Sequence, residues 1–175
     1  MLPGSDAHGD FNTPATTPSG YLGGMPLAAL TGRCLGVVTA AAGIVQAVDE
    51  AQIALIGVRD LDPPEAAALA ASAVAVLSAA ELRAAPAHLD AVLQRITSDA
   101  TLYLHLDVDV LDSELLPGAV YPTPDGWQLA ELAQVLKAVR QRCTPAAIAI
   151  TAINVAGGDQ ERILAGALDV IQKVL

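Results

Sequence analysis

Two short clusters of acidic and histidine residues have the composition and spacing of a metal site. Each has a potential ligand at every second position: Asp6, His8 and Asp10 in the first, and His105, Asp107 and Asp109 in the second. In an extended chain alternate side chains share one face, so each cluster can present three ligands together. Carboxylates this close repel one another unless they are protonated or meet cations. Mixed carboxylate and imidazole ligands suit Mn²⁺, Zn²⁺ or Fe²⁺ better than Ca²⁺.

The two clusters together predict metal binding more strongly than either does alone. A lone Asp-x-Asp after a strand is often a solvated turn, whereas two clusters at strand ends favour a bound metal. A bridged pair of ions about 3.5–4 Å apart could share a hydroxide and direct it at a planar carbon. Within the second cluster, we interpret His105 as a donor that orients Asp107, in preference to a direct ligand.

Apolar runs alternate with stretches of helical periodicity along the chain. Strands are predicted in four runs: 51–57, 73–77, 101–106 and 146–153. One helix is predicted to begin at a capping box formed by Ser78 and Glu81, and Pro86 is predicted to separate it from a second. A third should begin near Asp125 and Gln128, and the last from about Asp159. Apolar strands separated by helices imply a mostly parallel sheet covered on both faces. We therefore predict a three-layer α/β/α fold with its ligands at the carboxyl ends of the strands.

The composition indicates one folded domain and argues against several classes of partner. The chain has 175 residues, is 53% hydrophobic and carries a formal net charge of −10. The apolar content excludes intrinsic disorder, and the length suits a single domain over residues 1–175. The negative charge argues against nucleic-acid and anionic membrane partners, because both attract clustered Lys and Arg. No signal peptide, membrane span or cysteine motif is evident, so we expect a cytoplasmic protein.

Three segments resemble the arginase/agmatinase (ureohydrolase) superfamily. They are residues 6–20 (DAHGDFNTPATTPSG), residues 59–65 (RDLDPPE) and residues 105–112 (HLDVDVLD). Their order and spacing agree with the family over nearly the whole chain. The resemblance implies an arginase-type parallel sheet and two Mn²⁺ ions. It also implies hydrolysis of a C–N bond in a guanidino or amidine compound, usually with release of urea.

The resemblance assigns five residues to the metal ions. Asp6 and Asp107 would each contact both ions. His8 and Asp109 would complete the ligands of one ion, and Asp10 would bind the other. Asp10 and Asp109 are also the two residues expected to serve catalysis, Asp10 by accepting a hydrogen bond from the bridging hydroxide.

Three further residues match positions that hold the substrate of an arginase. Asn12 and Ser19 would bind its carboxylate, and Asp62 would meet its amino group. The side chains suit these roles, because Asn and Ser donate hydrogen bonds to an anion and a carboxylate attracts an ammonium group.

The sequence also departs from the family pattern. The family's upstream Gly-Gly-Asp-His motif is absent, and the strand that should lead into Asp6 is reduced to residues 1–5, which contain Pro and Gly and make a poor strand. We therefore expect an N-terminally truncated form, whose exposed sheet edge would favour homo-oligomers. Gly23 stands where arginases have a histidine thought to shuttle protons. Ala152 stands where the family has a glutamate that pairs with the guanidinium.

Two hypotheses for function follow. The first is a metal-dependent hydrolase of ureohydrolase type that acts on a guanidino or amidine compound; the substrate is unassigned, and the differences at Gly23 and Ala152 point away from arginine itself. Tyr21 and Tyr121 could line a less polar pocket in such an enzyme, although Tyr121 is equally consistent with ordinary loop packing. The second is a catalytically inert, arginase-like protein that serves as a metal-binding or oligomer-associating subunit.

Overall fold

A five-stranded sheet forms the centre of the protein in a computed structural model, which describes residues 2–95, 101–116, 119–142, 144–153, 161, 165–166, 168–169 and 171–172. The strand order is β3-β2-β1-β4-β5, and every neighbouring pair is parallel. The strands are β1 (Leu2–Ser5), β2 (Ile53–Val58), β3 (Ala75–Ser78), β4 (Tyr103–Asp107) and β5 (Ala147–Thr151). The parallel sheet agrees with the sequence-based expectation.

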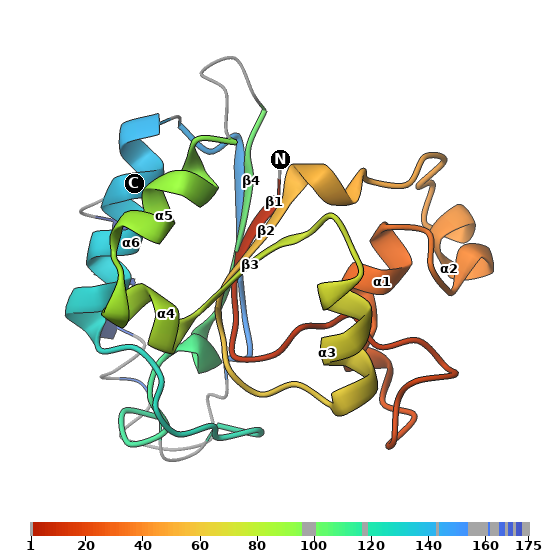
Figure 1. The fold of residues 1–175 in the computed structure, drawn as a ribbon, viewed down its shortest axis with the longest axis horizontal. Helices are drawn as coiled ribbons and strands as arrows, with labels where there is room; N and C mark the ends of the chain where they lie inside the picture. Colours follow the sequence, from red (N-terminus) through yellow and green to blue (C-terminus); the bar gives the residue numbers. More distant parts are fainter. Residues whose placement is uncertain are drawn as a thin grey trace.

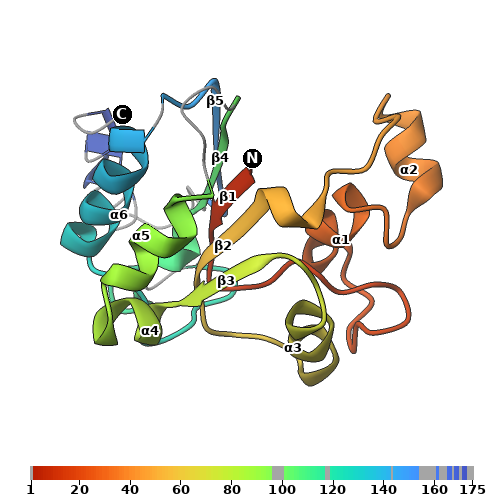
Figure 2. The same cartoon turned by 45° about the horizontal axis from the view of Figure 1, so that its top comes forward.

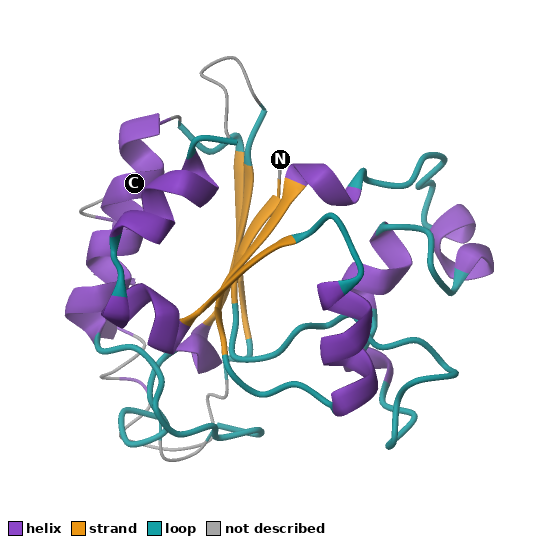
Figure 3. Ribbon diagram, viewed as in Figure 1, coloured by secondary structure: helices purple, strands orange, loops and turns teal. Residues whose placement is uncertain are grey.

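Helices cover both faces of the sheet and confirm the three-layer α/β/α architecture (Figure 1). One face carries α1 (Pro26–Leu30), α2 (Gly36–Ala41) and α3 (Pro63–Ala70), and the other carries α4 (Ala79–Ala84), α5 (Ala87–Leu93) and α6 (Leu129–Arg142). Figure 2 shows the same layers from a second direction, and Figure 3 distinguishes helices, strands and loops by colour. Short 3-10 helices are η1 (Leu22–Gly24), η2 (Glu50–Gln52) and η3 (Val108–Val110). None of the described helices has the length and apolar character needed to cross a membrane.

The side chains of β2 explain why its sequence is apolar throughout. Ala54 and Ile56 belong to the larger hydrophobic core, which includes side chains of α5 and α6. Ile53 and Leu55 belong to a second core with Phe11 and residues of α1 and α3. Alternate residues thus face opposite layers, and both layers bury them.

All four predicted strands are present, but the interpretation of residues 1–5 as a poor strand is wrong. Leu2–Ser5 is the central strand of the sheet and pairs with β2 on one side and β4 on the other. Backbone pairing on both sides outweighs the low strand propensity of Pro3 and Gly4, because strand propensity depends strongly on context. This strand sets the position of Asp6.

The predicted start of α4 and the break after it are both observed. The backbone amide of Glu81 donates to Ser78 Oγ at 3.1 Å, and the amide of Ser78 donates to Glu81 Oε2 at 2.9 Å, which completes the capping box. Pro86 separates α4 from α5, since it precedes the first residue of α5.

The next helix begins later than Asp125. That residue has a left-handed φ of 62°, and α6 starts at Leu129. Glu131 Oε2 instead accepts a hydrogen bond from the Gln128 amide at 2.8 Å. Most of the last predicted helix, from about Asp159, lies outside the described residues.

Candidate metal centre

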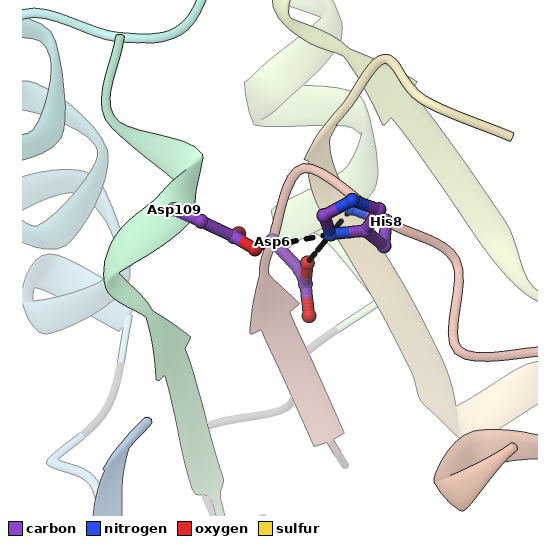
Figure 4. A group of neighbouring side chains, drawn as sticks. All are labelled: Asp6, His8 and Asp109. Carbon is purple, nitrogen blue, oxygen red and sulfur yellow. Dashed lines mark hydrogen bonds and ion pairs between the residues drawn. The ribbon is translucent and has the colours of Figure 1, made fainter. Parts of the chain in front are cut away.

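The two acidic clusters meet because the strands that precede them are neighbours. β1 and β4 pair in parallel close to their carboxyl ends, so the chain leaves both strands at the same edge of the sheet. Asp6 and His8 follow β1, while Asp107 ends β4 and Asp109 lies in η3. Figure 4 shows Asp6, His8 and Asp109 converging from these two segments.

The imidazole of His8 lies between two buried carboxylates. Its Nδ1 atom is 3.0 Å from Asp109 Oδ2 and 3.5 Å from Asp6 Oδ1. Asp6 and Asp109 are only 5% and 7% exposed. The hydrogen bond to Asp109, followed by that to Asp6, raises the pKa of His8 to about 10. A protonated His8 therefore offsets part of the negative charge of this carboxylate pair.

A second group forms around Asp107. The hydroxyl of Thr151, at the end of β5, donates to Asp107 Oδ2 at 2.9 Å and lies 3.1 Å from His105 Nε2. A hydroxyl has one proton, so His105 Nε2 must be the donor in the second contact. His105 thus reaches Asp107 through Thr151 in the metal-free protein.

Asp10 is held in the cavity by the start of α1. Its backbone carbonyl accepts hydrogen bonds from the amides of Leu27 and Ala28 at 3.0 and 3.2 Å, and its φ is 52°. Aspartate is one of the few residues other than glycine that visit this left-handed region. Burial, followed by repulsion from Asp6 and Asp107, raises the pKa of Asp10 to about 8. The charge of His8 opposes this shift but does not cancel it.

The donor set fits divalent metal ions. Two groups place three ligand atoms within 4.8 Å of one another, namely Asp6, His8 and Asp109, and Asp6, His105 and Asp107. Asp6 belongs to both groups, as a bridging carboxylate would, whereas Asp10 belongs to neither. Burial and the charge of Asp109 raise the pKa of Asp107 to about 6. Divalent ions would supply the positive charge that these buried carboxylates lack.

All eight residues predicted to form the site line one cavity of about 550 Å³. Of the three predicted substrate contacts, Asn12 donates through Nδ2 to Asp62 Oδ2 at 2.9 Å, so these two side chains hold each other. Ser19 lies at an exposed position of the same wall. The cavity is also lined by Gly23 and Ala152, the two positions that depart from the family pattern.

A sequence model of the Arginase family matches residues 5–161. The chain belongs to the arginase family. Among its relatives is the N(omega)-hydroxy-L-arginine amidinohydrolase of Streptomyces lavendulae, which is 40% identical over 134 residues that cover 77% of this chain and 44% of that protein. An arginase of Brevibacillus brevis is 35% identical over 124 residues, or 69% of this chain and 42% of that one.

The fold of this arginase-family chain agrees with solved arginase structures. The arginase of Bacillus caldovelox superposes with a TM-score of 0.84 at 26% identity, over 97% of this chain and 59% of that one. The arginase of Bacillus subtilis gives a TM-score of 0.83 at 25% identity, over 99% and 63%. The chain spans about half the length of the curated relatives named above.

Sequence reasoning missed the role of Arg59 in this arginase-family site. Its guanidinium donates to five backbone carbonyls, those of Asp109, Val110, Leu111, Thr123 and Pro124, at 2.8 to 3.2 Å. These contacts tie η3, which carries Asp109, to the loop before α6. The signals were a charged residue immediately after a buried strand and its place in the 59–65 segment that resembles the family.

Thr151 was also missed as a support of the site, and Glu65, within the 59–65 segment that carries the family resemblance, was given no role. Glu65 is 4% exposed, and its Oε1 atom accepts a hydrogen bond from the Phe11 amide at 2.8 Å. Burial raises the pKa of Glu65, although the Phe11 hydrogen bond opposes this shift. Both residues act across long sequence separations, which no local pattern reveals.

Replacing Thr151 by valine should weaken Mn²⁺ binding by about 10- to 100-fold, the usual cost of losing an outer partner of a metal ligand. Valine has nearly the same volume but cannot donate to Asp107 or accept from His105. Isothermal titration with Mn²⁺ measures the change. Thr39→Val on α2 is the matched control, since Thr39 bonds its own helix. Equal Mn²⁺ affinities for the two variants would show that the Thr151 hydroxyl does not support the site.

The metal-free protein should lose stability as the pH rises. The pKa of Asp10 is raised from 3.8 to about 8 and that of His8 from 6.5 to about 10, so the folded state binds more protons than the unfolded state between these values. With EDTA, the Tm should therefore fall from about pH 5 to about pH 9. The increase in Tm caused by Mn²⁺ should grow over the same range, because metal binding displaces these protons. A Mn²⁺ effect that is independent of pH would contradict this assignment.

Proposed function

We propose that this chain is a single arginase-like domain that acts as a binuclear manganese hydrolase of ureohydrolase type. The reaction would be cleavage of a C–N bond in a small guanidino or amidine compound. The observation that carries the proposal is the convergence of all eight predicted site residues on one cavity, with buried Asp6 and Asp109 facing His8. Family membership supports the same reaction class.

The protein residues would divide the work as follows. Asp6 and Asp107 would hold both Mn²⁺ ions, His8 and Asp109 one of them, and Asp10 the other. The bound ions would supply an activated water at neutral pH and polarise the reacting group. The Asp10 carboxylate lines the cavity, where it can accept a proton or a hydrogen bond from the attacking water.

The other wall of the cavity would orient the substrate. Asn12 and Ser19 can donate hydrogen bonds to an anionic tail, and Asp62 can bind an ammonium group. Position 152 carries only a methyl group and position 23 only hydrogen, so the guanidinium carboxylate and the proton-shuttling imidazole expected in an arginase are both missing. These two differences favour a guanidino or amidine substrate other than L-arginine.

The second candidate is an inert, arginase-like protein that serves as a metal-binding or oligomer-associating subunit. Gly23 and Ala152 favour this candidate. Assembly into homo-oligomers and a cytoplasmic location remain predictions under both candidates.

Metal analysis and an activity panel distinguish the candidates. After loading with Mn²⁺ and removal of excess metal, the hydrolase should retain close to two ions per chain, as measured by mass spectrometry. It should then release urea or ammonia from at least one of L-arginine, agmatine and N(omega)-hydroxy-L-arginine. Retention of Mn²⁺ without product would favour the inert subunit. No retained metal would overturn the hydrolase and leave only an inert, oligomer-associating subunit.

A further inference from the structure

Two tyrosines expose part of their aromatic rings in the cavity of the candidate metal centre. Tyr21 and Tyr121 come from segments far apart in the sequence, yet their ring centroids are 5.6 Å apart at an interplanar angle of 46°. The residues are 55% and 50% exposed, and both line the cavity of the candidate metal centre. About half of each residue is exposed, so part of this aromatic pair is open to a ligand.

The aromatic pair lies next to the metal centre. The ring of Tyr121 meets that of His8 edge-on, with centroids 6.2 Å apart and an interplanar angle of 79°. A group bound against the pair would therefore be close to the reacting end of the cavity. Tyrosine faces attract cations and also stack with planar guanidinium groups.

The Tyr21 ring occupies space that a side chain at position 23 would need. A Cβ atom added to Gly23 would lie 2.5 Å from Tyr21 Cζ and 2.7 Å from its hydroxyl oxygen. Real Cβ atoms do not approach other atoms so closely, so any larger residue at position 23 must displace the ring. The absence of a side chain at Gly23 and the position of the Tyr21 ring are thus sterically coupled.

The remaining wall offers the cation no carboxylate at position 152. Ala152 lines the cavity with a φ of 56°, an uncommon conformation for alanine, and contributes only a methyl group. Three acids line the cavity farther out: Asp62 accepts from Asn12, Glu65 accepts from the Phe11 amide, and Asp60 lies 3.8 Å from His8 Nε2. An aromatic surface beside these acids is a further means of binding a planar cation.

We propose that Tyr21 and Tyr121 bind the planar cation of the substrate, a guanidinium or amidinium group, and that Gly23 is required to seat the Tyr21 ring. This inference rests on the proposed function, because it concerns the same cavity and names its substrate class. The specificity of the site then comes from aromatic faces in place of a carboxylate. Neutral compounds of the same shape should gain little from this surface.

Two ligands of similar shape, one with a cationic group and one with a neutral group, distinguish binding of the charge from binding of the shape. Agmatine carries a guanidinium, and N-carbamoylputrescine carries a neutral urea group on the same chain. Isothermal titration of the Mn²⁺-loaded protein should show that Tyr21→Leu and Tyr121→Leu each weaken agmatine binding by about 5- to 30-fold, the range for a cation on an aromatic face. Binding of N-carbamoylputrescine should change by less than about 2-fold. Tyr21→Phe should retain more agmatine affinity than Tyr21→Leu, because the ring remains.

Two glycine variants test the coupling between positions 21 and 23. Gly23→Ala should weaken agmatine binding when Tyr21 is present and should have little further effect in Tyr21→Leu. Gly24→Ala is the matched control, since a Cβ there meets no atom within 4 Å. Thermal melts of each variant check that the fold is intact, as expected for exposed rings.

The outcomes separate this inference from the proposed function. Equal losses for agmatine and N-carbamoylputrescine would overturn the cation-binding role. Additive effects of Gly23→Ala and Tyr21→Leu would overturn the coupling. Selective loss of agmatine binding in a protein that releases no urea would support the aromatic site and refute hydrolysis. Urea release from agmatine that neither leucine variant changes would support hydrolysis and refute the aromatic site.

Discussion

Replacing Asp6 by asparagine should weaken Mn²⁺ binding by more than about 100-fold. Loss of an outer partner already costs about 10- to 100-fold, and Asp6 is a candidate ligand shared by both metal groups. The side chain is also buried beside the His8 imidazole, so solvent has little access to compensate the loss of its negative charge. Isothermal titration with Mn²⁺ and metal analysis after desalting measure the effect on each ion.

A matched acid on the outside of the protein provides the control for Asp6→Asn. Asp90 is an exposed residue in the first turn of α5, which lies on one face of the sheet and does not line the cavity. Asp90→Asn should leave Mn²⁺ affinity unchanged within about 2-fold. If Asp6→Asn bound two ions as tightly as this control, the assignment of a bridging role to Asp6 would be wrong.

Replacing Arg59 by alanine should lower the free energy of unfolding by about 3 kcal/mol or more. The change leaves five backbone carbonyls without their charged donor, and some of these lie in a half-buried region that water cannot fully reach. Urea denaturation measures the loss. Mn²⁺ affinity should fall as well, because the freed segment carries Asp109.

Two other arginine variants show whether the Arg59 geometry matters. Arg59→Lys keeps the charge but lacks the planar fork, so it should recover only part of the lost stability. Arg95 is exposed and donates to the Ala73 carbonyl, so Arg95→Ala should change the stability by no more than about 0.5 kcal/mol. Full stability in Arg59→Lys would mean that charge alone, without the fork, is sufficient.

The parts of the fold that could be predicted are those with a local cause. The uninterrupted apolar run of β2 reflects two buried faces, and the Ser78 and Glu81 pair fixes the start of α4 through contacts three residues apart. The alternate spacing in the first acidic cluster likewise brings Asp6 and His8 to one side. The edge of a parallel sheet then brings the second cluster to the same place.

The parts that could not be predicted depend on partners distant in the sequence. Pro3 and Gly4 disfavour a strand locally, and only the neighbouring strands make one. Thr151 reaches Asp107, and Arg59 reaches the η3 carbonyls, across dozens of intervening residues. Such contacts become visible only when the strand order is known.

Because β1 is the central strand, the two halves of the sheet are joined through its short pairing with β4, which is called the seam below. Among the described strands, β1 alone connects the β3–β2 pair to the β4–β5 pair, and its register with β4 consists of only two residue pairs. The metal ligands lie across this same seam, with Asp6 and His8 on one side and Asp107 and Asp109 on the other. An ion bound between them would link the two halves of the sheet. Loading with metal should therefore slow their separation and make the domain unfold as a single cooperative unit.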